Sequence, residues 1–295
     1  MKWRNRKQSS NVDDRRSSSG RPGGGGRGLP SIGTLMFLWP LVKPLLRSKL
    51  GMAAVGIGAV AYFGGFIPSF SSLTGSGSKP VSEAVDDEQA AFIKTVKADT
   101  ERVWSKIFSQ AGQRYPIPEL VLYRGGTDSG CGPARAGMGP FYCPSDKKVY
   151  VDLSFFNDLK HKHGAGGDFA QAYVIAHEIG HHVQNIEGTL DKVQHAKRSV
   201  RGSKENQLQV MVELQADCYA GVWTHHTQKE LNSLEPGDLE EALTAAASIG
   251  DDRLQEQAQG FSIPHTFTHG SSKQRVEWFA KGVKSGLVKD CNTFN

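Results

Sequence analysis

Apolar residues recur every three or four positions along several stretches of this chain, the spacing of one buried face of an α-helix. The clearest stretch is 168–187, whose buried stripe would consist of Phe169, Ala172, Ala176, Ile179, Val183 and Ile186. Asp168 is suited to begin this helix, and Gly188 to end it. The same reasoning predicts helices at 83–110, 168–187, 205–228, 238–249 and 271–284.

Two short apolar runs have the character of β-strands. Residues 119–123 and 148–155 are rich in Val, Leu, Tyr and Phe, and Gly, Pro or Asp residues bound each run. Strands mixed with longer helices indicate an α+β fold. We therefore expect residues 83–295 to form one mostly helical domain with a small sheet.

A different pattern precedes this domain. No charged residue occurs from Leu50 to Ser78, and residues 50–70 would span about 30 Å as a helix. A cleaved signal peptide lies nearer the N-terminus and has a shorter apolar region, and a buried core helix is the other alternative. The pattern favours a single transmembrane helix at 50–70, followed by a linker at 71–82. If the interrupted apolar run 32–46 also crossed, the two spans would form a hairpin.

Charge is distributed unevenly between the two ends of the chain. Residues 1–49 contain 11 Lys and Arg against two Asp, a net charge of +9, which leaves −4 for residues 50–295 because the whole chain carries +5. The Arg, Ser and Gly composition of residues 1–49 predicts a disordered basic arm. The positive-inside rule places this arm in the cytoplasm and residues 83–295 on the periplasmic, extracytoplasmic side of the membrane. A mildly acidic body is not expected to bind nucleic acid.

The four cysteines contain no C-x-x-C pair, so a cysteine-based zinc site is not expected. Cys131 and Cys143 bracket a stretch rich in Gly and Pro that could close as a disulfide loop, and Cys218 with Cys291 would form the second pair. Four buried free thiols are the alternative. An oxidising compartment favours the disulfides.

The sequence AHEIGHH in the second predicted helix indicates a metal site. His177 and His181 lie four residues apart, so both rings project from one face and can bind one ion through neutral nitrogen atoms. Zinc takes such ligands at about 2.0–2.1 Å. Glu178 lies beside them and can take a proton from a water molecule. Solvated surface histidines are the alternative, but the helix is otherwise apolar, and polar groups buried there are costly without a partner.

A third ligand is expected from the next helix, in VELQADCYAG. Glu213 would complete a His₂Glu set for Zn²⁺, and Asp217, one turn later, would accept the N–H of a ligand histidine and set its tautomer. The neighbouring residues are nearly all apolar, so a solvated acidic face fits this segment poorly.

With these motifs the chain resembles the gluzincin metallopeptidases and, more closely, the bacterial family of putative neutral zinc metallopeptidases. The resemblance covers nearly the whole chain. It is carried by the basic arm and apolar run and by GCGPARAGMGPFYCPSDKKVYVDLSFF, AHEIGHHVQ, ELQADCYAG, AASIGDDRLQ and FTHGSSKQRVEWF. It implies a zincin-like hydrolase with His177, His181 and Glu213 as ligands and Glu178 as catalytic base.

Two further expectations follow from this resemblance. Gluzincins commonly stabilise the oxyanion with a later histidine, and His269 in FTHGSSKQ resembles that residue. Zinc peptidases also hold their substrate as an added strand, for which 149–155 is the expected edge. The predicted partners are therefore a peptide or protein substrate and, through residues 50–70, a membrane. A non-catalytic, zinc-stabilised and membrane-tethered binding module is the alternative function.

Overall fold

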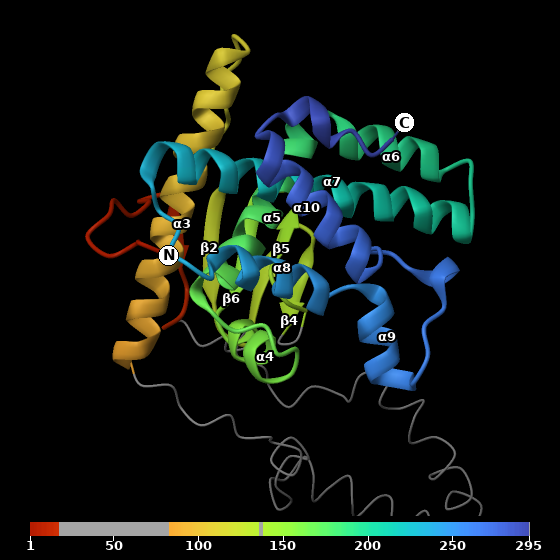
Figure 1. Ribbon diagram of the computed structural model, residues 1–295, viewed down its shortest axis with the longest axis horizontal. Helices are drawn as coiled ribbons and strands as arrows, with labels where there is room; N and C mark the ends of the chain where they lie inside the picture. Colours follow the sequence, from red (N-terminus) through yellow and green to blue (C-terminus); the bar gives the residue numbers. More distant parts are fainter. Residues whose placement is uncertain (18–82, 136–137, 295) are drawn as a thin grey trace, which may run out of the picture. The chain divides into compact units, whose positions relative to one another are not determined.

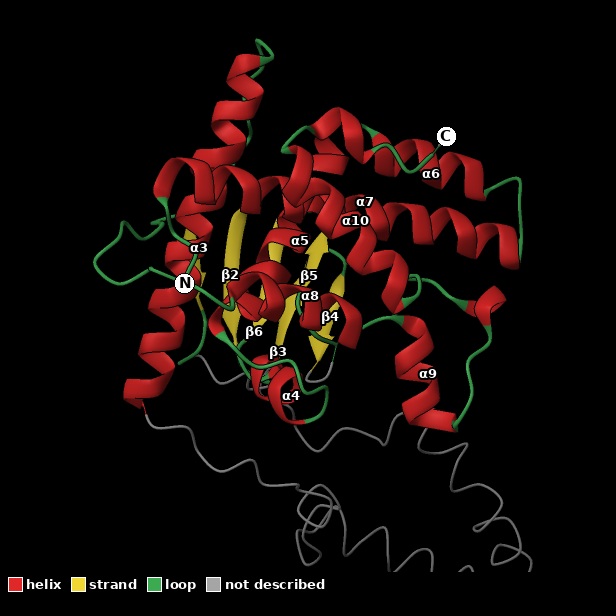
Figure 2. Cartoon of the chain, in the orientation of Figure 1, coloured by secondary structure: helices red, strands yellow, loops and turns green. Residues whose placement is uncertain are grey.

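The computed structural model describes residues 1–17, 83–135 and 138–294 of the chain. These residues are mostly helical, with two small sheets (Figure 2). The helices are α3 (Glu83–Gln110), α4 (Phe155–His161), α5 (Asp168–Ile186), α6 (Thr189–Lys197), α7 (Ser203–Leu231), α8 (Asp238–Ser248), α9 (Asp251–Gln259) and α10 (Ser272–Ser285), with 3₁₀ turns η2 (Pro264–Thr266) and η3 (Val288–Cys291). The strands are β1 (Val12–Asp14), β2 (Glu119–Tyr123), β3 (Gly126–Ser129), β4 (Gly132–Arg135), β5 (Phe141–Cys143) and β6 (Lys148–Asp152).

The main sheet has the strand order β1-β2-β6-β5. β1, β2 and β6 are parallel, and β5 runs antiparallel to β6. Alternate side chains of β2 enter different cores, as the twofold period of a strand requires. Leu120 and Leu122 belong to the large core that includes the helices, whereas Val121 and Tyr123 form a smaller cluster with Ala134 of the β3–β4 hairpin. The sheet is therefore buried on both faces.

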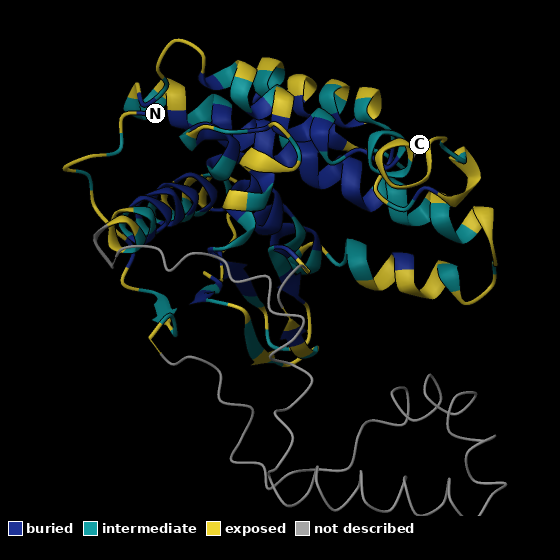
Figure 3. Ribbon diagram, turned by 90° about the horizontal axis from the view of Figure 1, so that it is seen from below, coloured by how far each residue is buried: buried dark blue, intermediate teal, exposed yellow. Residues whose placement is uncertain are grey.

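Helix α5 occupies the centre of the domain. It contacts β5 and β6 of the sheet and packs against α3, α7 and α8. Helices α7 and α10 run alongside each other (Figure 1), and Figure 3 shows buried residues concentrated where the helices meet. Fourteen of the 19 residues of α5 are buried, which is why its polar residues must find partners within the protein.

The first 17 residues are ordered, which corrects the prediction of a disordered arm for this part of 1–49. They belong to the same compact unit as residues 83–294. β1 adds a strand to the sheet, with Val12 opposite Leu120, and the backbone N–H of Ser9 donates to the carbonyl of Lys94. Met1 is only 5% exposed.

Ion pairs between residues far apart in the sequence explain why the composition of this segment gave a wrong prediction of disorder. Arg6 contacts Asp99 at 2.5 Å, and Arg16 contacts Asp86 at 3.2 Å and Asp87 at 3.1 Å. Arginines that would keep an isolated segment solvated are neutralised by acids of α3. The charge that suggested disorder therefore attaches this segment to the body.

The single-pass membrane prediction is wrong. None of the helices in the described part of the chain is both long and apolar enough to cross a membrane. The predicted locations, residues 1–49 in the cytoplasm and residues 83–295 outside it, depended on that span and are corrected with it. The predicted span, 50–70, and the predicted linker, 71–82, lie outside the described residues.

Both predicted disulfides are present. Cys131 bonds to Cys143 and joins the β3–β4 hairpin to β5, and Cys218 of α7 bonds to Cys291 of η3. The two bonds differ in surroundings, because Cys131 is exposed whereas Cys218 and Cys291 are both 0% exposed. The second bond therefore fixes the C-terminal segment within the core.

Candidate metal centre

Helix α5 presents three polar side chains at the centre of the domain. His177 and Glu178 are 6% and 8% exposed, and His181 is half-buried. The rings of His177 and His181 lie one helical turn apart with centroids separated by 4.8 Å. The predicted i, i+4 pair therefore faces a common point.

Helix α7 brings the third predicted side chain to this point. The Glu213 Oε2 atom lies 3.3 Å from His177 Nε2 and 3.6 Å from His181 Nε2. Gly180 permits the approach of α7, because a Cβ atom there would lie 3.0 Å from the carbonyl oxygen of Ala216. The ligand atoms of His177, His181 and Glu213 all lie within 4.8 Å of one another.

The two distances from Glu213 are compatible with a shared zinc ion. Bonds of about 2.0–2.1 Å would place neighbouring ligand atoms of a tetrahedron roughly 3.3 Å apart, close to the 3.3 and 3.6 Å between Glu213 Oε2 and the two imidazole nitrogens. The Nδ1 atom of His177 lies 2.8 Å from Asp217 Oδ1, and that of His181 lies 2.9 Å from Gln184 Oε1. Both Nε2 atoms consequently face Glu213. The chemistry and direction of the three donors fit Zn²⁺.

The pKa values of the cluster show that it attracts positive charge. Burial lowers the pKa of His177, but the carboxylates of Asp217 and Glu213 outweigh burial and raise it to about 10. Burial raises the pKa of Glu213, but the facing His181 and His177 hold it well below its usual range. Two buried carboxylates thus favour a cation at the two imidazoles.

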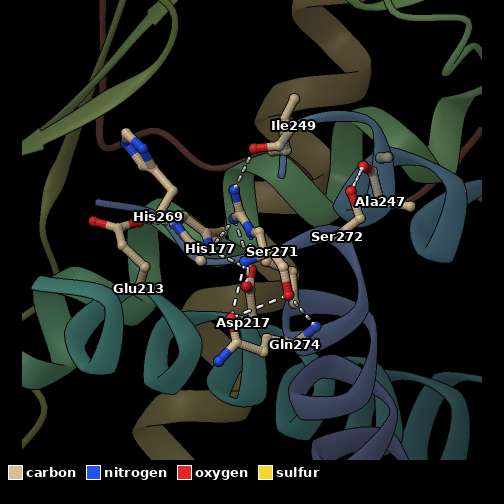
Figure 4. A network of polar contacts seen from close by, with 12 residues as sticks. His177, Glu213, Asp217, Ala247, Ile249, His269, Ser271, Ser272 and Gln274 are labelled. Atoms are coloured by element: carbon tan, nitrogen blue, oxygen red, sulfur yellow. Dashed lines mark hydrogen bonds and ion pairs between the residues drawn. The ribbon is translucent and has the colours of Figure 1, made fainter. Parts of the chain in front are cut away.

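Asp217 lies in a buried network that the sequence did not reveal in full. Arg275 of α10 donates from Nε to Asp217 Oδ2 and from Nη2 to Oδ1, both at 2.9 Å, and the Tyr173 hydroxyl donates to Oδ1. Burial raises the pKa of Asp217, but Arg275 and His177 lower it to about 2. Asp217 therefore remains a carboxylate, and its Oδ1 atom lies within hydrogen-bond distance of His177 Nδ1. Figure 4 shows His177 and Asp217 within this network.

Two glutamines that contact the candidate ligands were not predicted from the sequence. Gln184 contacts His181, three residues earlier on α5, and Gln209 Nε2 donates to Glu213 Oε1 at 2.9 Å from the preceding turn of α7. Their i, i+3 and i, i+4 spacings to the ligand candidates were a usable signal. The Gln209 contact leaves Glu213 Oε2 directed to the histidines.

His269 lines the same cavity but is separate from the three clustered donors. Its Nδ1 atom lies 3.2 Å from Asp251 Oδ1, and this contact raises its pKa. Its side chain is 52% exposed. Figure 4 shows His269 and Glu213 on the same side of the network. The structure thus places His269 at the cavity, where a bound molecule can reach it.

A cavity of about 620 Å³ lies over Glu178 and the two histidines. Burial raises the pKa of Glu178, although His181 and His177 oppose the increase. Its other lining residues include both apolar side chains, such as Phe155, Val174 and Leu190, and polar ones, such as Asn185 and Gln194.

The strand at this cavity is not the predicted one. β6, the predicted edge within 149–155, lies inside the sheet between β2 and β5. β5 is the edge strand, and its Phe141 and Tyr142 line the cavity. A three-residue strand between Gly139-Pro140 and Pro144 has too few positions to show an alternating pattern.

Fold and site together define a mostly helical protein in which two histidines and a glutamate that could hold a metal ion meet beside a second carboxyl group at a cavity. The chain belongs to the family described as "Putative neutral zinc metallopeptidase", whose model matches residues 1–294. It is 46% identical over 304 residues to "Uncharacterized protein YpfJ" of Escherichia coli strain K12, covering 100% of this chain and 99% of that protein. It is also 46% identical over 191 residues to "Uncharacterized protein Rv2575" of Mycobacterium tuberculosis strain H37Rv, covering 61% of this chain and 64% of that protein. No solved structure matches.

Proposed function

We propose that this protein is a zinc-dependent peptidase in which His177, His181 and Glu213 hold the ion. The observation that carries the proposal is the convergence of the three donor atoms beside Glu178 at the floor of an open cavity. When bound, zinc would supply a Lewis acid that lowers the pKa of a water molecule and polarises the substrate carbonyl.

Glu178 acts as the general base in this proposal. Its carboxylate takes a proton from the attacking water and passes it to the nitrogen of the leaving amine. Burial raises the pKa of Glu178, which favours its holding the proton between the two transfers. Asp217 and Gln184 keep the proton of each ligand histidine on Nδ1.

His269 supplies a hydrogen bond to the developing oxyanion. Its Nδ1–H donates to Asp251, which favours the imidazolium form, and Nε2–H is then free to donate to substrate. In this proposal an extended peptide pairs with the outer edge of β5, the strand whose Phe141 and Tyr142 line the cavity.

The alternative of a non-catalytic zinc module is less well supported. Among the described residues the cluster contains three donors, which leaves one position of a tetrahedron for water or substrate. Structural zinc sites fill all four positions with protein ligands. A carboxyl group beside an open position serves catalysis.

The test compares purified wild-type protein with Glu178→Gln and Glu213→Ala for bound zinc and for cleavage of a peptide library. We expect Glu178→Gln to keep its zinc and to lose roughly 10²–10⁴-fold in turnover, because only the base is removed. Glu213→Ala should lose zinc as well, because it removes a ligand and a charge. Zinc-loaded wild-type protein that cleaves no peptide would instead support the binding module.

A further inference from the structure

The two ligand histidines are oriented in chemically different ways. His177 donates to a carboxylate, which can only accept a hydrogen bond. His181 faces the amide of Gln184, whose two ends are an acceptor and a donor. The amide would stabilise the wrong tautomer of His181 if it presented its NH₂ group. Something must therefore fix which end of Gln184 faces the ring.

A chain of buried hydrogen bonds continues from Gln184. Its Nε2 atom donates to the Val212 carbonyl at 2.7 Å and to Gln215 Oε1 at 3.0 Å. Gln215 Nε2 in turn donates to the Cys291 carbonyl at 3.2 Å. Gln184 and Cys291 are 0% exposed, and Gln215 is 6% exposed. Water is thus kept from exchanging with either amide.

The donor-to-acceptor direction of these hydrogen bonds follows from the two carbonyl groups at which they end. The backbone carbonyls of Val212 and Cys291 can only accept hydrogen bonds. Gln215 must therefore direct its NH₂ to Cys291 and its oxygen to Gln184, and Gln184 must direct its own NH₂ away from His181. The Gln184 oxygen then faces Nδ1 of His181. Nδ1 has to carry the proton, and Nε2 keeps its lone pair for the metal.

The far end of the chain is held by a disulfide. Cys291 is bonded to Cys218, which lies three residues after Gln215 on α7. The bond fixes the Cys291 carbonyl against the helical turn that presents Gln215. Resting on the proposed function, we propose that Gln184, Gln215 and the Cys218–Cys291 disulfide act as positioning elements for His181 and set how tightly it binds zinc.

The test measures the apparent zinc dissociation constant by competition with a chelator, for full-length wild-type protein and four variants. Gln184→Leu should weaken binding roughly 10–100-fold, the usual effect of losing such a partner. Gln215→Leu and Gln215→Glu should both weaken it to a smaller degree. Glu has about the size of Gln, but in its ionised form it cannot donate to the Cys291 carbonyl, so this variant removes the bond with little loss of packing. Cys218→Ala with Cys291→Ala should resemble Gln215→Leu.

A second measurement does not depend on activity or affinity. In zinc-loaded wild-type protein the Nδ1–H proton of His181 should give a slowly exchanging NMR signal, because it is buried and hydrogen-bonded. In the Gln215 variants that proton should exchange faster with water. A purely structural role would lower the melting temperature without changing the exchange rate of this one proton.

The matched control removes the other disulfide, with Cys131→Ala and Cys143→Ala, which lie off this chain of contacts. The control should keep wild-type zinc affinity. If wild type binds zinc and both Gln215 variants bind it equally tightly with unchanged proton exchange, the positioning role of Gln215 and the disulfide is overturned and the proposed function stands. If wild type binds no zinc, the proposed function is overturned, and the positioning role of these residues is overturned with it.

Discussion

Asp217 and Arg275 form the most completely buried ion pair near the site, with side chains 0% and 3% exposed. Two charges removed from water in this way depend on each other, because either one alone would be left without compensation. The Asp217 carboxylate also contacts His177 Nδ1, through its Oδ1 atom. Arg275 therefore stabilises the domain and also keeps Asp217 charged for its contact with the ligand histidine.

We expect Arg275→Met to lower the free energy of unfolding by about 3–5 kcal/mol, the usual cost of removing one partner of a buried pair. Urea denaturation monitored by fluorescence measures this loss. The control is Lys273→Met on the same helix, whose side chain is 83% exposed and whose removal should cost no more than about 0.5 kcal/mol. A loss below 1 kcal/mol for Arg275→Met would mean that Asp217 finds another partner.

His182 gives a prediction for pH. Its Nε2 donates to the Pro116 carbonyl at 2.6 Å, so its Nδ1 accepts from the Tyr142 hydroxyl at 3.0 Å, an arrangement available only to the neutral ring. Burial lowers the pKa of His182 to about 4. Between pH 6.5 and pH 4 the unfolded chain thus binds the proton more readily than the folded one. The contribution of neutral His182 to stability is fully present above pH 6.5 and is lost as the pH falls toward 4.

At about 1.36 kcal/mol per pH unit, this residue should remove roughly 3 kcal/mol of stability by pH 4. The measurement is the free energy of unfolding at pH 7, 6, 5 and 4 for wild type and for His182→Gln, which cannot titrate in this range. The variant should show the shallower decline, and His195→Gln, at an exposed position, should match wild type. Parallel profiles for wild type and His182→Gln would refute the assignment.

At the scale of elements, helices α7 and α10 are joined by direct backbone contact. A Cβ atom on Gly282 would lie 2.0 Å from the Cys218 carbonyl oxygen, and one on Gly221 would lie 2.2 Å from that of Phe279. This close packing places Arg275 of α10 against Asp217 of α7. Glycine is needed at these positions for space, since each lies within a regular helix.

Gly282→Ala should therefore separate α7 from α10 and destabilise the domain by at least about 1–3 kcal/mol, the usual cost of overpacking. It should do so although alanine favours a helix by about 1 kcal/mol over glycine. Thermal denaturation of Gly282→Ala beside Lys281→Ala, one residue earlier on an exposed face, measures the difference. An unchanged melting temperature for Gly282→Ala would show that the helices can shift at little cost.

At the scale of the whole molecule, the domain is larger than residues 83–295. Residues 1–17 supply β1, and without them the parallel edge of β2 would present unpaired backbone groups. Trp3 packs on Phe92 with ring centroids 5.5 Å apart, and Phe92 is 3% exposed in the complete unit. The N-terminal segment is thus part of the core structure.

A fragment comprising residues 83–295 should unfold at a lower denaturant concentration than the full chain and be cleaved faster by protease. A synthetic peptide of residues 1–17 added to the fragment should restore protection, and a peptide of the same composition in scrambled order should not. If the fragment alone matched the full chain in both assays, residues 1–17 would contribute no stability.

The sequence by itself predicted the long helices and the spacing of the metal-ligand candidates, and it offered both disulfide pairs beside the alternative of four free thiols. A helix repeats its pattern over many residues, and the spacing of His177 and His181 is a property of one helix, so this information is local. The sequence did not determine β5, because three residues are too few to show a period. It did not determine the place of residues 1–17, whose composition reads as disordered until the acids of α3 are set beside them.

Only the tertiary structure decided which distant polar groups meet. Arg275 is 58 residues from Asp217 and Gln215 is 76 residues from Cys291, and neither pair has a spacing that a local pattern could show. The burial of these groups makes their pairing obligatory, because an unpaired polar group in a core costs several kcal/mol. Which partner satisfies each group depends on how α5, α7, α10 and the C-terminal turn pack, and that packing is a property of the folded chain.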